Sequence, residues 1–484
     1  MNMRKAKIVC TIGPASTSPA ILTRLIESGM DAARLNFSHG THESHAAAIT
    51  AIRQAATQHG SAVAIIQDLQ GPRIRVGLVA QAGIDVKPGQ TVRVRAVAES
   101  EEQPDSQPST EVSSPEIPVT YPSLTHDLRV GARLLIDDGR VELIADRIAD
   151  EVVECSVVTG GTITSHKGIN LPGTVVNAPT VTEKDRNDIR FGVKHGVDYV
   201  ALSFVRGAQD IQLARSLLAE CGRPVPIIAK IERAEAVTAL DEILEQVDGV
   251  MIARGDLGVE LEPEAVPVLQ KRIIVEANRR RRLVITATQM LESMTQATRP
   301  TRAEASDVAN AVFDGTDAVM LSAETAVGCY PIETVQVMDR IIRAAEGEVE
   351  PGVILKRQTD LENLPFPEAV CTAAFSAAKA ISASAIVVFS ERGPTARLIA
   401  KQRPAAPIVA FTPFESVRQR MALYWGVRPL TIPQIEHTDA RVGEAERRLK
   451  SEGLVKTGEK IVILSGTQVG QPGGTNLMKL HEVG

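Results

Sequence analysis

Short apolar runs rich in branched residues alternate with amphipathic stretches along most of the chain. This alternation predicts strand and helix units around a parallel sheet, because each buried strand is followed by a helix that covers it. Eight runs have the length and composition of buried strands. They are residues 8–12, 32–37, 62–67, 199–204, 226–231, 249–253, 283–288 and 318–322, and helical patterns follow them, for example at 19–28, 42–59, 235–246 and 302–313. Eight parallel strands with a helix after each predict a closed (β/α)8 barrel.

The series of strands and helices is interrupted once, after the third strand. Residues 73–167 lack a helical period and contain turn signals such as Lys87-Pro88-Gly89, so we predict an inserted β domain that divides the barrel into residues 1–72 and 168–346. Within it, residues 99–116 are rich in Ser, Pro and acidic residues, which predicts a mobile surface loop. Residues 347–367 are typical of a linker, and the strand and helix signals after it predict a C-terminal α/β domain, so that residues 347–484 form a third unit.

Composition narrows the possible partners and compartment. A chain of 484 residues predicts several domains, and its net charge of −6 offers no general attraction for nucleic acid, so an anion site needs local cations. No segment approaches the length of a membrane span, and no signal-peptide hydrophobic region is present. The cysteines are too dispersed for a zinc site and predict reduced thiols in a cytoplasmic protein. They are Cys10, Cys155, Cys221, Cys329 and Cys371.

Polar residues lie at the ends of five predicted strands. The active site of a (β/α)8 barrel forms at the C-terminal ends of its strands. One such residue alone could be a barrel-mouth side chain satisfied by a neighbour, but complementary charges from five strand ends indicate a functional site. The residues are Arg34, Asn36 and Ser38 at the second strand, Asp68 at the third, Lys230 and Glu232 at the fifth, Arg254 and Asp256 at the sixth and Thr288 at the seventh.

The fifth and sixth strand ends suggest phosphoryl chemistry. Lys230 and Glu232 are two residues apart, so their side chains share a face and point to the barrel interior. Asp256 lies in an RGDLG segment, where glycines and free helix amides suit a substrate carboxylate. Glu232 and Asp256 together suit magnesium, which keeps its other positions for water and substrate. A Lys230–Glu232 salt bridge is the simpler alternative, but the additional cations Arg34 and Arg75 favour stabilisation of a transferring phosphoryl group.

Seven motifs along the chain closely resemble those of the pyruvate kinase family. They read KIVCTIGP at 7–14, ARLNFSHG at 33–40, AKIE at 229–232, RGDLG at 254–258, TATQMLE at 286–292, RPTRAEASD at 299–307 and LSAET at 321–325. The resemblance covers nearly the whole chain. It implies a (β/α)8 TIM barrel with an inserted β-barrel lid domain and a C-terminal α/β regulatory domain. It further implies transfer of phosphate from phosphoenolpyruvate to ADP, giving pyruvate and ATP, the last step of glycolysis, with Mg2+ or Mn2+ as cofactor and a D2 homotetramer as the assembly.

The resemblance also implies roles for individual residues. Lys230 would stabilise the transferring phosphoryl group, Arg34 would hold the phosphate, and Glu232 and Asp256 would bind magnesium. The substrate carboxylate would bind the Gly255 and Asp256 amides and the Thr288 hydroxyl, while Thr288 and Ser322 would belong to a water relay that protonates enolpyruvate. The nucleotide would lie near Asn36, Phe37, Ser38, His39 and Arg75, with Lys167 reaching in from the lid.

One departure from the family pattern concerns potassium. Asn36, Ser38 and Asp68 match potassium ligands of the family. However, Leu69, Gln70 and Arg73 stand where potassium-dependent relatives carry Thr, Lys and Glu. We therefore expect a potassium-independent-like member in which the positions Asn36, Ser38, Asp68 and Leu69 bind no potassium. The Arg73 guanidinium would supply the charge instead. The alternative is that Arg73 turns outward and the potassium site survives.

The C-terminal domain contains a candidate effector loop. Ser390 to Thr395 enters a helix whose amides and hydroxyls suit a phosphate. An ordinary turn between strand and helix is the alternative. The resemblance implies the sugar-phosphate activator loop of the family, with Ser390, Arg392, Gly393 and Thr395 as contacts, although Arg392 and Pro394 differ from the usual residues. A sugar phosphate or AMP is therefore the expected effector class.

Two other functions remain possible from the residues alone. A magnesium-dependent lyase or aldolase that handles pyruvate on a similar barrel would use the same pair of Glu and Asp, but it would not need Lys167 on a lid. A metabolite-sensing relic would bind ligand without turnover, and the intact Lys230, Glu232, Asp256 and Thr288 argue against it.

Overall fold

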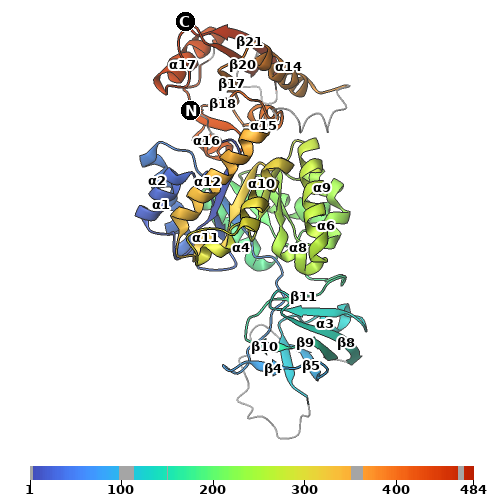
Figure 1. The fold of residues 1–484 in the computed structure, drawn as a ribbon. Coiled ribbons are helices and arrows are strands. Elements are labelled where there is room, and N and C mark those ends of the chain that lie inside the picture. The colour runs from blue at the N-terminus through green and yellow to red at the C-terminus, as the bar shows by residue number, and fades with distance from the viewer. Residues whose placement is uncertain (1–3, 98–113, 150, 350–362, 436, 467–473) are drawn as a thin grey trace.

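The computed structural model describes residues 4–97, 114–149, 151–349, 363–435, 437–466 and 474–484. The predicted loop at 99–116 and linker at 347–367 lie largely outside these ranges. The described parts form three units in a row, with the C-terminal α/β domain at one end of a central barrel and the inserted β domain at the other (Figure 1).

All eight predicted strands form the central barrel. It is closed in the order β1-β16-β15-β14-β13-β12-β3-β2, and every recorded neighbour pair is parallel. The predicted barrel is thus confirmed. The strands are β1 (Lys7–Thr11), β2 (Ala32–Asn36), β3 (Ala64–Asp68), β12 (Tyr199–Leu202), β13 (Ile227–Ile231), β14 (Gly249–Ala253), β15 (Leu283–Ala287) and β16 (Ala318–Leu321).

Helices cover the outside of the barrel. Two of them begin and end where the sequence predicts, because Ser18 and Thr41 accept hydrogen bonds from first-turn amides and left-handed Gly29 and Gly60 end them. The predicted helix at 235–246 is wrong in one respect, since Ala239 leaves helical geometry (ψ 17°) and divides it into α6 and α7. The elements are α1 (Pro19–Ser28), α2 (His42–His59), α4 (Glu183–His195), α5 (Ala208–Glu220), α6 (Ala234–Thr238), α7 (Leu240–Gln246), α8 (Arg254–Glu260), η1 (Pro263–Ala265), α9 (Val266–Arg279), η2 (Glu292–Thr295), α10 (Arg302–Asp314), α11 (Ala323–Ala326) and α12 (Pro331–Glu348).

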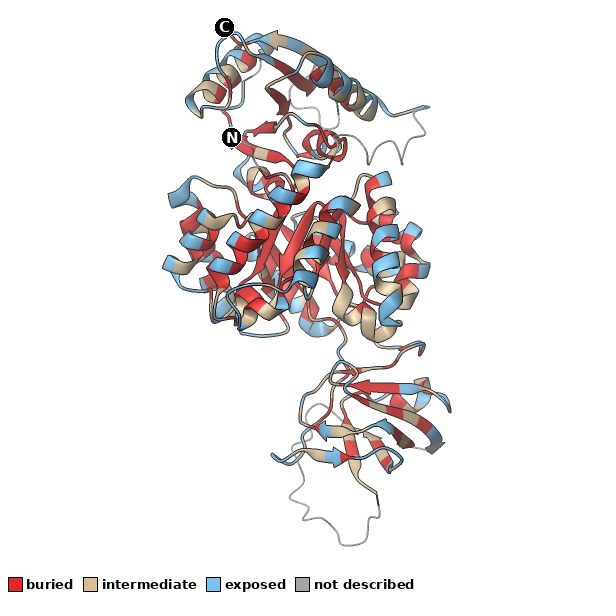
Figure 2. Cartoon of the chain, viewed as in Figure 1, coloured by how far each residue is buried: buried red, intermediate tan, exposed pale blue. Residues whose placement is uncertain are grey.

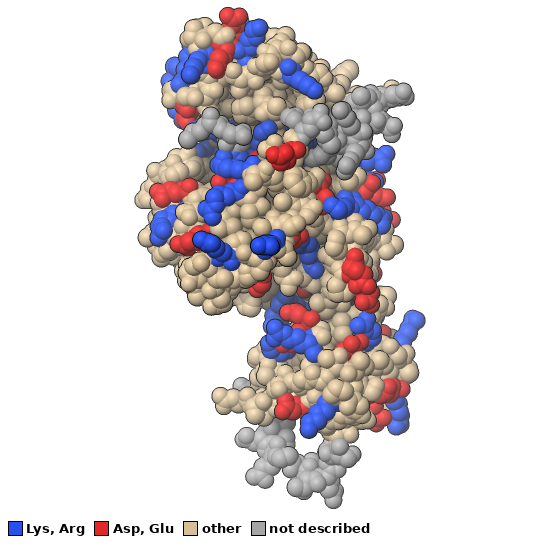
Figure 3. Space-filling view, in the orientation of Figure 1, with Lys and Arg blue, Asp and Glu red and all other residues tan. Residues whose placement is uncertain are grey.

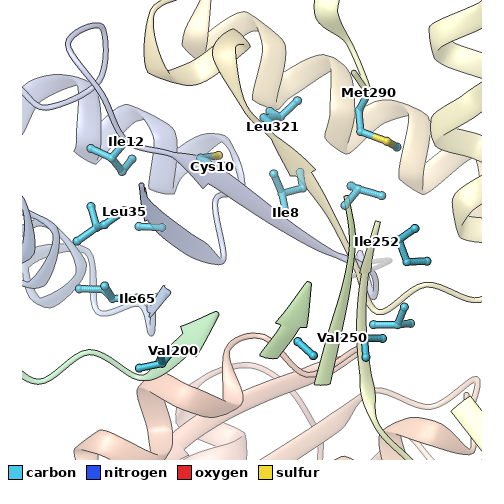
Figure 4. Packing of buried hydrophobic residues seen from close by; sticks show 14 of the residues in the cluster. Ile8, Cys10, Ile12, Leu35, Ile65, Val200, Val250, Ile252, Met290 and Leu321 are labelled. Atoms are coloured by element: carbon cyan, nitrogen blue, oxygen red, sulfur yellow. The ribbon is translucent and has the colours of Figure 1, made fainter. Parts of the chain in front are cut away.

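The main core lies between the barrel strands and the helices. Figure 2 shows the strands buried and the helices exposed only on their outer faces. Branched residues such as Ile8, Leu35 and Ile252 pack in this layer (Figure 4). Because these strands are covered on both faces, they read as continuous apolar runs, which is why the sequence reveals them.

The inserted domain is a curled sheet with its own core. Six strands pair in the order β11-β7-β8-β9-β5-β6, and β10 pairs with β4. The sheet continues to Asn170, beyond the predicted boundary at residue 168, because β11 pairs with β7. Its elements are β4 (Ile84–Val86), β5 (Thr91–Ala96), β6 (Glu116–Val119), α3 (Leu124–Asp127), β7 (Arg133–Ile136), β8 (Val141–Ala149), β9 (Val152–Thr159), β10 (Gly161–Ile163) and β11 (Ile169–Asn170).

The C-terminal domain packs against the end of the barrel where the strands begin. Its sheet has the order β19-β18-β17-β20-β21, with only β21 antiparallel. One apolar cluster joins the barrel interior to this domain, and Tyr199 Oη donates to Arg420 O at 3.0 Å. The elements are α14 (Phe366–Ala380), β17 (Ala385–Phe389), α15 (Pro394–Lys401), β18 (Ile408–Thr412), α16 (Glu415–Met421), β19 (Val427–Thr431), α17 (Thr438–Ser451), β20 (Lys460–Gly466) and β21 (Thr475–Glu482).

All five cysteines are free thiols, and burial raises the pKa of Cys155 and Cys371 to about 12. Within the described ranges, no helix has the length and apolar character needed to cross a membrane.

Candidate active site

The polar strand ends predicted from the sequence converge at the barrel mouth that faces the inserted domain. The chain leaves the barrel for this domain directly after β3 and returns before α4, so the insert starts at the mouth. Space-filling spheres in Figure 3 show Lys, Arg, Asp and Glu side chains gathered around the narrow connection between the two units. The barrel strands carry few charged residues, so the charged side chains at the mouth must neutralise one another.

Asp68 at the end of β3 is the centre of the charge network. Its Oδ2 accepts a hydrogen bond from Arg34 Nε at 2.6 Å, and its Oδ1 lies 3.4 Å from Lys230 Nζ. Lys230 Nζ is also 2.7 Å from Glu232 Oε1. Arg34 reaches across to Thr11 Oγ1 at 3.1 Å. Two cations and two carboxylates at the ends of β2, β3 and β13 therefore form one cluster.

Lys230 and Asp68 keep their charges despite burial. Burial lowers the pKa of Lys230, but Asp68 and Glu232 outweigh it and raise that pKa above the ordinary value. Burial raises the pKa of Asp68, yet Lys230 and Arg34 bring it below its ordinary value. The ammonium is thus held protonated beside an ionised carboxylate at neutral pH.

The fourth barrel strand also contributes to the site, which the sequence analysis missed. Ser203, directly after β12, is buried, and its Oγ lies 2.8 Å from Lys230 Nζ and 2.7 Å from Leu69 O. The next residue, Phe204, has φ 55° and donates its amide to Glu232 Oε2 at 2.7 Å. The signal was a serine at a barrel strand end, which is weak because serine is also frequent in ordinary turns.

The candidate site for the substrate carboxylate lies between the ends of β14 and β15. Thr288 adopts φ 67°, a rare conformation for a β-branched residue, and its Oγ1 accepts a hydrogen bond from Gly255 N at 2.8 Å. Arg254 donates to Thr288 O at 2.7 Å and pairs with Asp307 at 2.7 Å. The predicted Thr288 and Gly255 therefore lie in contact, and Arg254 holds the strained turn in place.

Glu232 and Asp256 suit a divalent cation. Burial raises the pKa of Glu232, and the nearby negative charge of Asp256 raises it further, while Lys230 opposes both. Asp256 lies in the first turn of α8 and is half-buried. Two carboxylates that repel each other and retain free oxygen lone pairs form a fitting donor set for magnesium. In the described parts of the chain, no group of three or more His, Cys, Asp or Glu residues could hold a metal, so these two would need substrate or water to complete the shell.

Ser322 lies after β16 with an unusual backbone, φ −108° and ψ −101°. Its Oγ is buried and has no hydrogen-bond partner among the residues that the structure describes. Its amide donates to Glu324 Oε2 at 2.6 Å, and Glu324 Oε1 accepts from Leu291 N at 3.1 Å. The buried Glu324 thus ties the segments after β15 and β16 together and leaves the Ser322 hydroxyl available.

The predicted nucleotide residues after β2 divide into two kinds. Phe37 is buried, its ring stacks on His45 at 4.0 Å, and its carbonyl accepts from Lys184 Nζ at 2.7 Å. Its side chain thus packs in the core rather than facing a ligand. Ser38 is half-buried, and His39 is exposed. Burial lowers the pKa of His39, and the cations Arg73, Arg75 and Arg34 lower it further, so this surface has an excess of positive charge.

The oxygen atoms at the potassium positions mostly have protein partners. Asn36 Oδ1 accepts from Ser38 N at 3.1 Å, and Leu69 O accepts from Ser203. Both oxygens of Asp68 face cations. Arg73 is exposed, as the alternative interpretation required, and it lies close enough to His39 to affect that residue's pKa. Whether Arg73 replaces potassium stays a prediction.

Arg75 and Lys167 belong to the connection with the inserted domain. Arg75 pairs with Gly168 in an isolated bridge and donates to His166 O at 3.1 Å. Lys167 Nζ forms an ion pair with Asp137 at 2.8 Å inside the inserted domain. Lys167 therefore has an anionic partner that a nucleotide would have to replace.

The candidate effector loop lines a cavity of ≈ 180 Å³ in the C-terminal domain. Ser390 Oγ accepts from Gly393 N at 3.0 Å, and Gly393 has φ 94°, which requires glycine. Arg392 and Thr395 line the same cavity. Arg441, which the sequence analysis missed, also lines it and stacks 4.9 Å over Phe389.

Comparisons with known proteins agree with this arrangement. Family models described as "Pyruvate kinase, barrel domain" and "Pyruvate kinase, alpha/beta domain" match residues 3–335 and 368–481. The chain is 47% identical to the pyruvate kinase of Geobacillus stearothermophilus over 99% of its length and 80% of the relative. It is 43% identical to that of Mycobacterium intracellulare over 99% of both chains. A crystal structure of a pyruvate kinase from Cryptosporidium parvum superposes with a TM-score of 0.91 at 38% identity, covering 99% of this chain and 96% of that one.

Proposed function

Because the chain belongs to the pyruvate kinase family, we propose that its barrel mouth transfers the phosphoryl group of phosphoenolpyruvate to ADP through the residues described above. The enzyme is a phosphotransferase that gives pyruvate and ATP. One observation supports the residue assignment most strongly. Arg34 and Lys230, two cations from separate strands, both contact the buried carboxylate of Asp68. Two such cations can stabilise the negative charge on the equatorial oxygens of a phosphoryl group during its transfer.

Substrate binding follows from the polar groups at the mouth. The carboxylate of phosphoenolpyruvate binds the Gly255 and Asp256 amides at the start of α8 and the Thr288 hydroxyl, exchanging with the present Gly255–Thr288 hydrogen bond. Arg34 uses its free guanidinium edge for the phosphate, because Asp68 and Thr11 occupy only part of its donor set. The phosphate is thereby brought to Lys230.

Lys230 stabilises charge during transfer. Its ammonium is already oriented by buried partners before negative charge redistributes on the phosphoryl oxygens. Glu232 and Asp256 would hold magnesium, which supplies positive charge to the substrate oxygens when bound. ADP enters along the surface beside His39, where Arg73 and Arg75 supply positive charge. Closure of the inserted domain would bring Lys167 to the nucleotide and exclude water.

Enolpyruvate must then take a proton on carbon. Ser322 and Thr288 lie on adjacent strand ends, and the Ser322 hydroxyl lacks a partner among the described residues. We assign both hydroxyls to a relay that passes a proton from water. Their ordinary acidity is low, so orientation rather than proton affinity is their contribution.

Pyruvate formation coupled to lactate dehydrogenase tests the function. The wild type should form pyruvate from phosphoenolpyruvate only with ADP and a divalent cation, whereas a lyase or aldolase would not depend on ADP. Lys230→Met should lose roughly 10² to 10³ in kcat, because a fixed charge at the transition state is removed. K379M, at an exposed lysine, is the control. A K230M variant that melts like the wild type and keeps more than about a tenth of kcat would refute the assignment.

We further propose that potassium is not required. The oxygens that would bind potassium already have partners in the protein, namely Asn36 Oδ1, Leu69 O and the Asp68 carboxylate. The positive charge of Arg73 near His39 also supports the proposal. Turnover in buffer free of sodium and potassium, with tetramethylammonium holding the ionic strength, should change less than about tenfold when potassium is added. Arg73→Glu should make turnover potassium-dependent. Stronger stimulation of the wild type would mean that the ion still performs the role assigned to Arg73.

Three finer features complete the proposal. A phosphorylated effector, a sugar phosphate or AMP, would bind at Ser390, Arg392, Gly393 and Thr395. The assembly would be a D2 homotetramer, which light scattering at assay concentration can check, a monomer being the contrary result. Free thiols and a glycolytic reaction favour the cytoplasm.

A further inference from the structure

The turn after β12 is built around Ser203, a residue with no role in the proposed function. Its side chain is 3% exposed, and its hydroxyl makes two hydrogen bonds in series. Oγ donates to Leu69 O at 2.7 Å and accepts from Lys230 Nζ at 2.8 Å. Since the single hydroxyl hydrogen is used for Leu69, an oxygen lone pair is directed at the ammonium.

Lys230 Nζ has three oxygen neighbours and three hydrogens. Glu232 Oε1 lies at 2.7 Å, Ser203 Oγ at 2.8 Å and Asp68 Oδ1 at 3.4 Å. Ser203 is the neutral member of this set. A neutral acceptor fixes the direction of the ammonium without cancelling its charge, whereas a third carboxylate would weaken the field available to a phosphoryl group.

The same turn also contacts Glu232. Phe204 has φ 55°, a conformation that costs energy for a bulky residue, and its amide donates to Glu232 Oε2 at 2.7 Å. Strain of this kind persists where the surrounding structure requires a specific geometry. Ser203 and Phe204 therefore hold Lys230 in β13 and Glu232 directly after it.

We propose that Ser203 is a positioning residue for phosphoryl transfer. Its hydroxyl is held by the carbonyl of Leu69 and orients the Lys230 ammonium. This inference rests on the proposed role of Lys230. Because Leu69 is the first residue after β3, the two hydrogen bonds make the backbone of that segment the fixed support of the reacting group. A displacement of the Leu69 carbonyl is passed to Nζ through one side chain.

Steady-state kinetics of Ser203→Ala, with phosphoenolpyruvate varied at saturating ADP and Mg2+, test the proposal. A mispositioned ammonium should lower kcat at least tenfold, because small displacements of a catalytic group are costly. The KM for phosphoenolpyruvate should change less than threefold, since Arg34 and the carboxylate site are untouched. Ser203→Thr, which keeps the hydroxyl, should recover kcat to within threefold of the wild type.

Ser465→Ala is the matched control, because Ser465 is also a buried serine but lies in the C-terminal domain. Its kcat should equal that of the wild type. Ser203→Cys keeps the shape of serine with a somewhat larger atom and a weaker donor, so its kcat should fall between those of S203A and the wild type. It replaces either variant that fails to fold.

Two results would overturn the inference. One is an S203A protein that melts like the wild type and keeps more than a tenth of its kcat. The other is an equal loss in the Ala, Cys and Thr variants when all three melt normally, which would indicate packing rather than positioning. K230M separates this inference from the function it rests on. An active K230M removes both, whereas an inactive K230M beside an active S203A overturns the positioning role alone.

Discussion

Lys401 offers a sharp test of how charge is buried between the barrel and the C-terminal domain. Its side chain is 1% exposed, lies at the end of α15 and reaches the barrel, where Nζ contacts Asp317 and donates to Asn278 Oδ1 at 2.7 Å. Arg403 pairs with the other oxygen of Asp317 at 2.9 Å. Burial lowers the pKa of Lys401 from 10.5 to about 7, although Asp317 opposes the shift and Arg403 and Arg397 assist it. We predict that Lys401→Met changes the pH dependence of stability.

The sign of the effect follows from proton uptake. Between pH 7 and 10.5 the unfolded chain binds a proton at Lys401 that the folded protein has released, so this group makes stability rise with pH. Below pH 7 both states are protonated, and its contribution is constant. Within this window, each full pH unit raises the free energy of unfolding by about 1.4 kcal/mol. Because Lys401 is only partly titrated near pH 7, the total rise between pH 7 and 9 is about 2 kcal/mol. Buried Lys7 contributes with the same sign but remains in both proteins.

Thermal unfolding of the wild type and K401M from pH 6 to 9 measures this contribution. The melting temperature of the wild type relative to K401M should rise by roughly 2 °C from pH 7 to 9, because an unfolding entropy of about 2.1 cal/mol/K per residue gives about 1 °C per kcal/mol for a chain of 484 residues. K379M, at an exposed lysine of α14, should give a curve parallel to the wild type. Parallel curves for K401M and the wild type would refute the reasoning, because they would mean that Lys401 keeps its proton in the folded protein.

Two further predictions concern other contacts. Glu324→Gln should lower the free energy of unfolding by about 1–3 kcal/mol in a denaturant titration. The side-chain amide has one oxygen and cannot accept from both Leu291 N and Ser322 N, so one buried donor is left unpaired. Unchanged stability would contradict this geometry. Arg441→Leu should leave basal kcat unchanged but abolish any effector-induced shift of the phosphoenolpyruvate saturation curve. The effectors to test are fructose 1,6-bisphosphate, ribose 5-phosphate, glucose 6-phosphate and AMP. A response that persists in R441L would exclude this cavity as the effector site.

The barrel could be predicted because its signal is local. A strand buried on both faces must be apolar throughout, and a covering helix must be amphipathic, so each unit is visible in its own short stretch. The division of α6 and α7 at Ala239 could not be seen, since no glycine or proline marks it. The extension of the inserted sheet to Asn170 depends on pairing with Leu135, a partner distant in sequence.

The site could be predicted where charge density identified it. Arg34, Asp68, Lys230 and Glu232 are charged residues at the ends of apolar strands, and such residues are costly to bury without a function or a partner. Ser203 lacked this signal because a neutral hydroxyl at a strand end is unremarkable until its partners are known. Arg441 likewise lies in α17, far along the chain from the loop that it faces.

Lys230 shows why sequence alone could not choose between a salt bridge and a catalytic role. The structure contains the salt bridge, with Glu232 Oε1 at 2.7 Å. A buried ammonium without substrate needs an anionic partner, since an uncompensated charge would be costly. The same ammonium can act on a phosphoryl group only if that partner can be shared or exchanged when the substrate brings negative charge of its own. Ion pairing in the free enzyme is therefore a physical requirement of the catalytic role, and the two interpretations describe one residue in two states of the site.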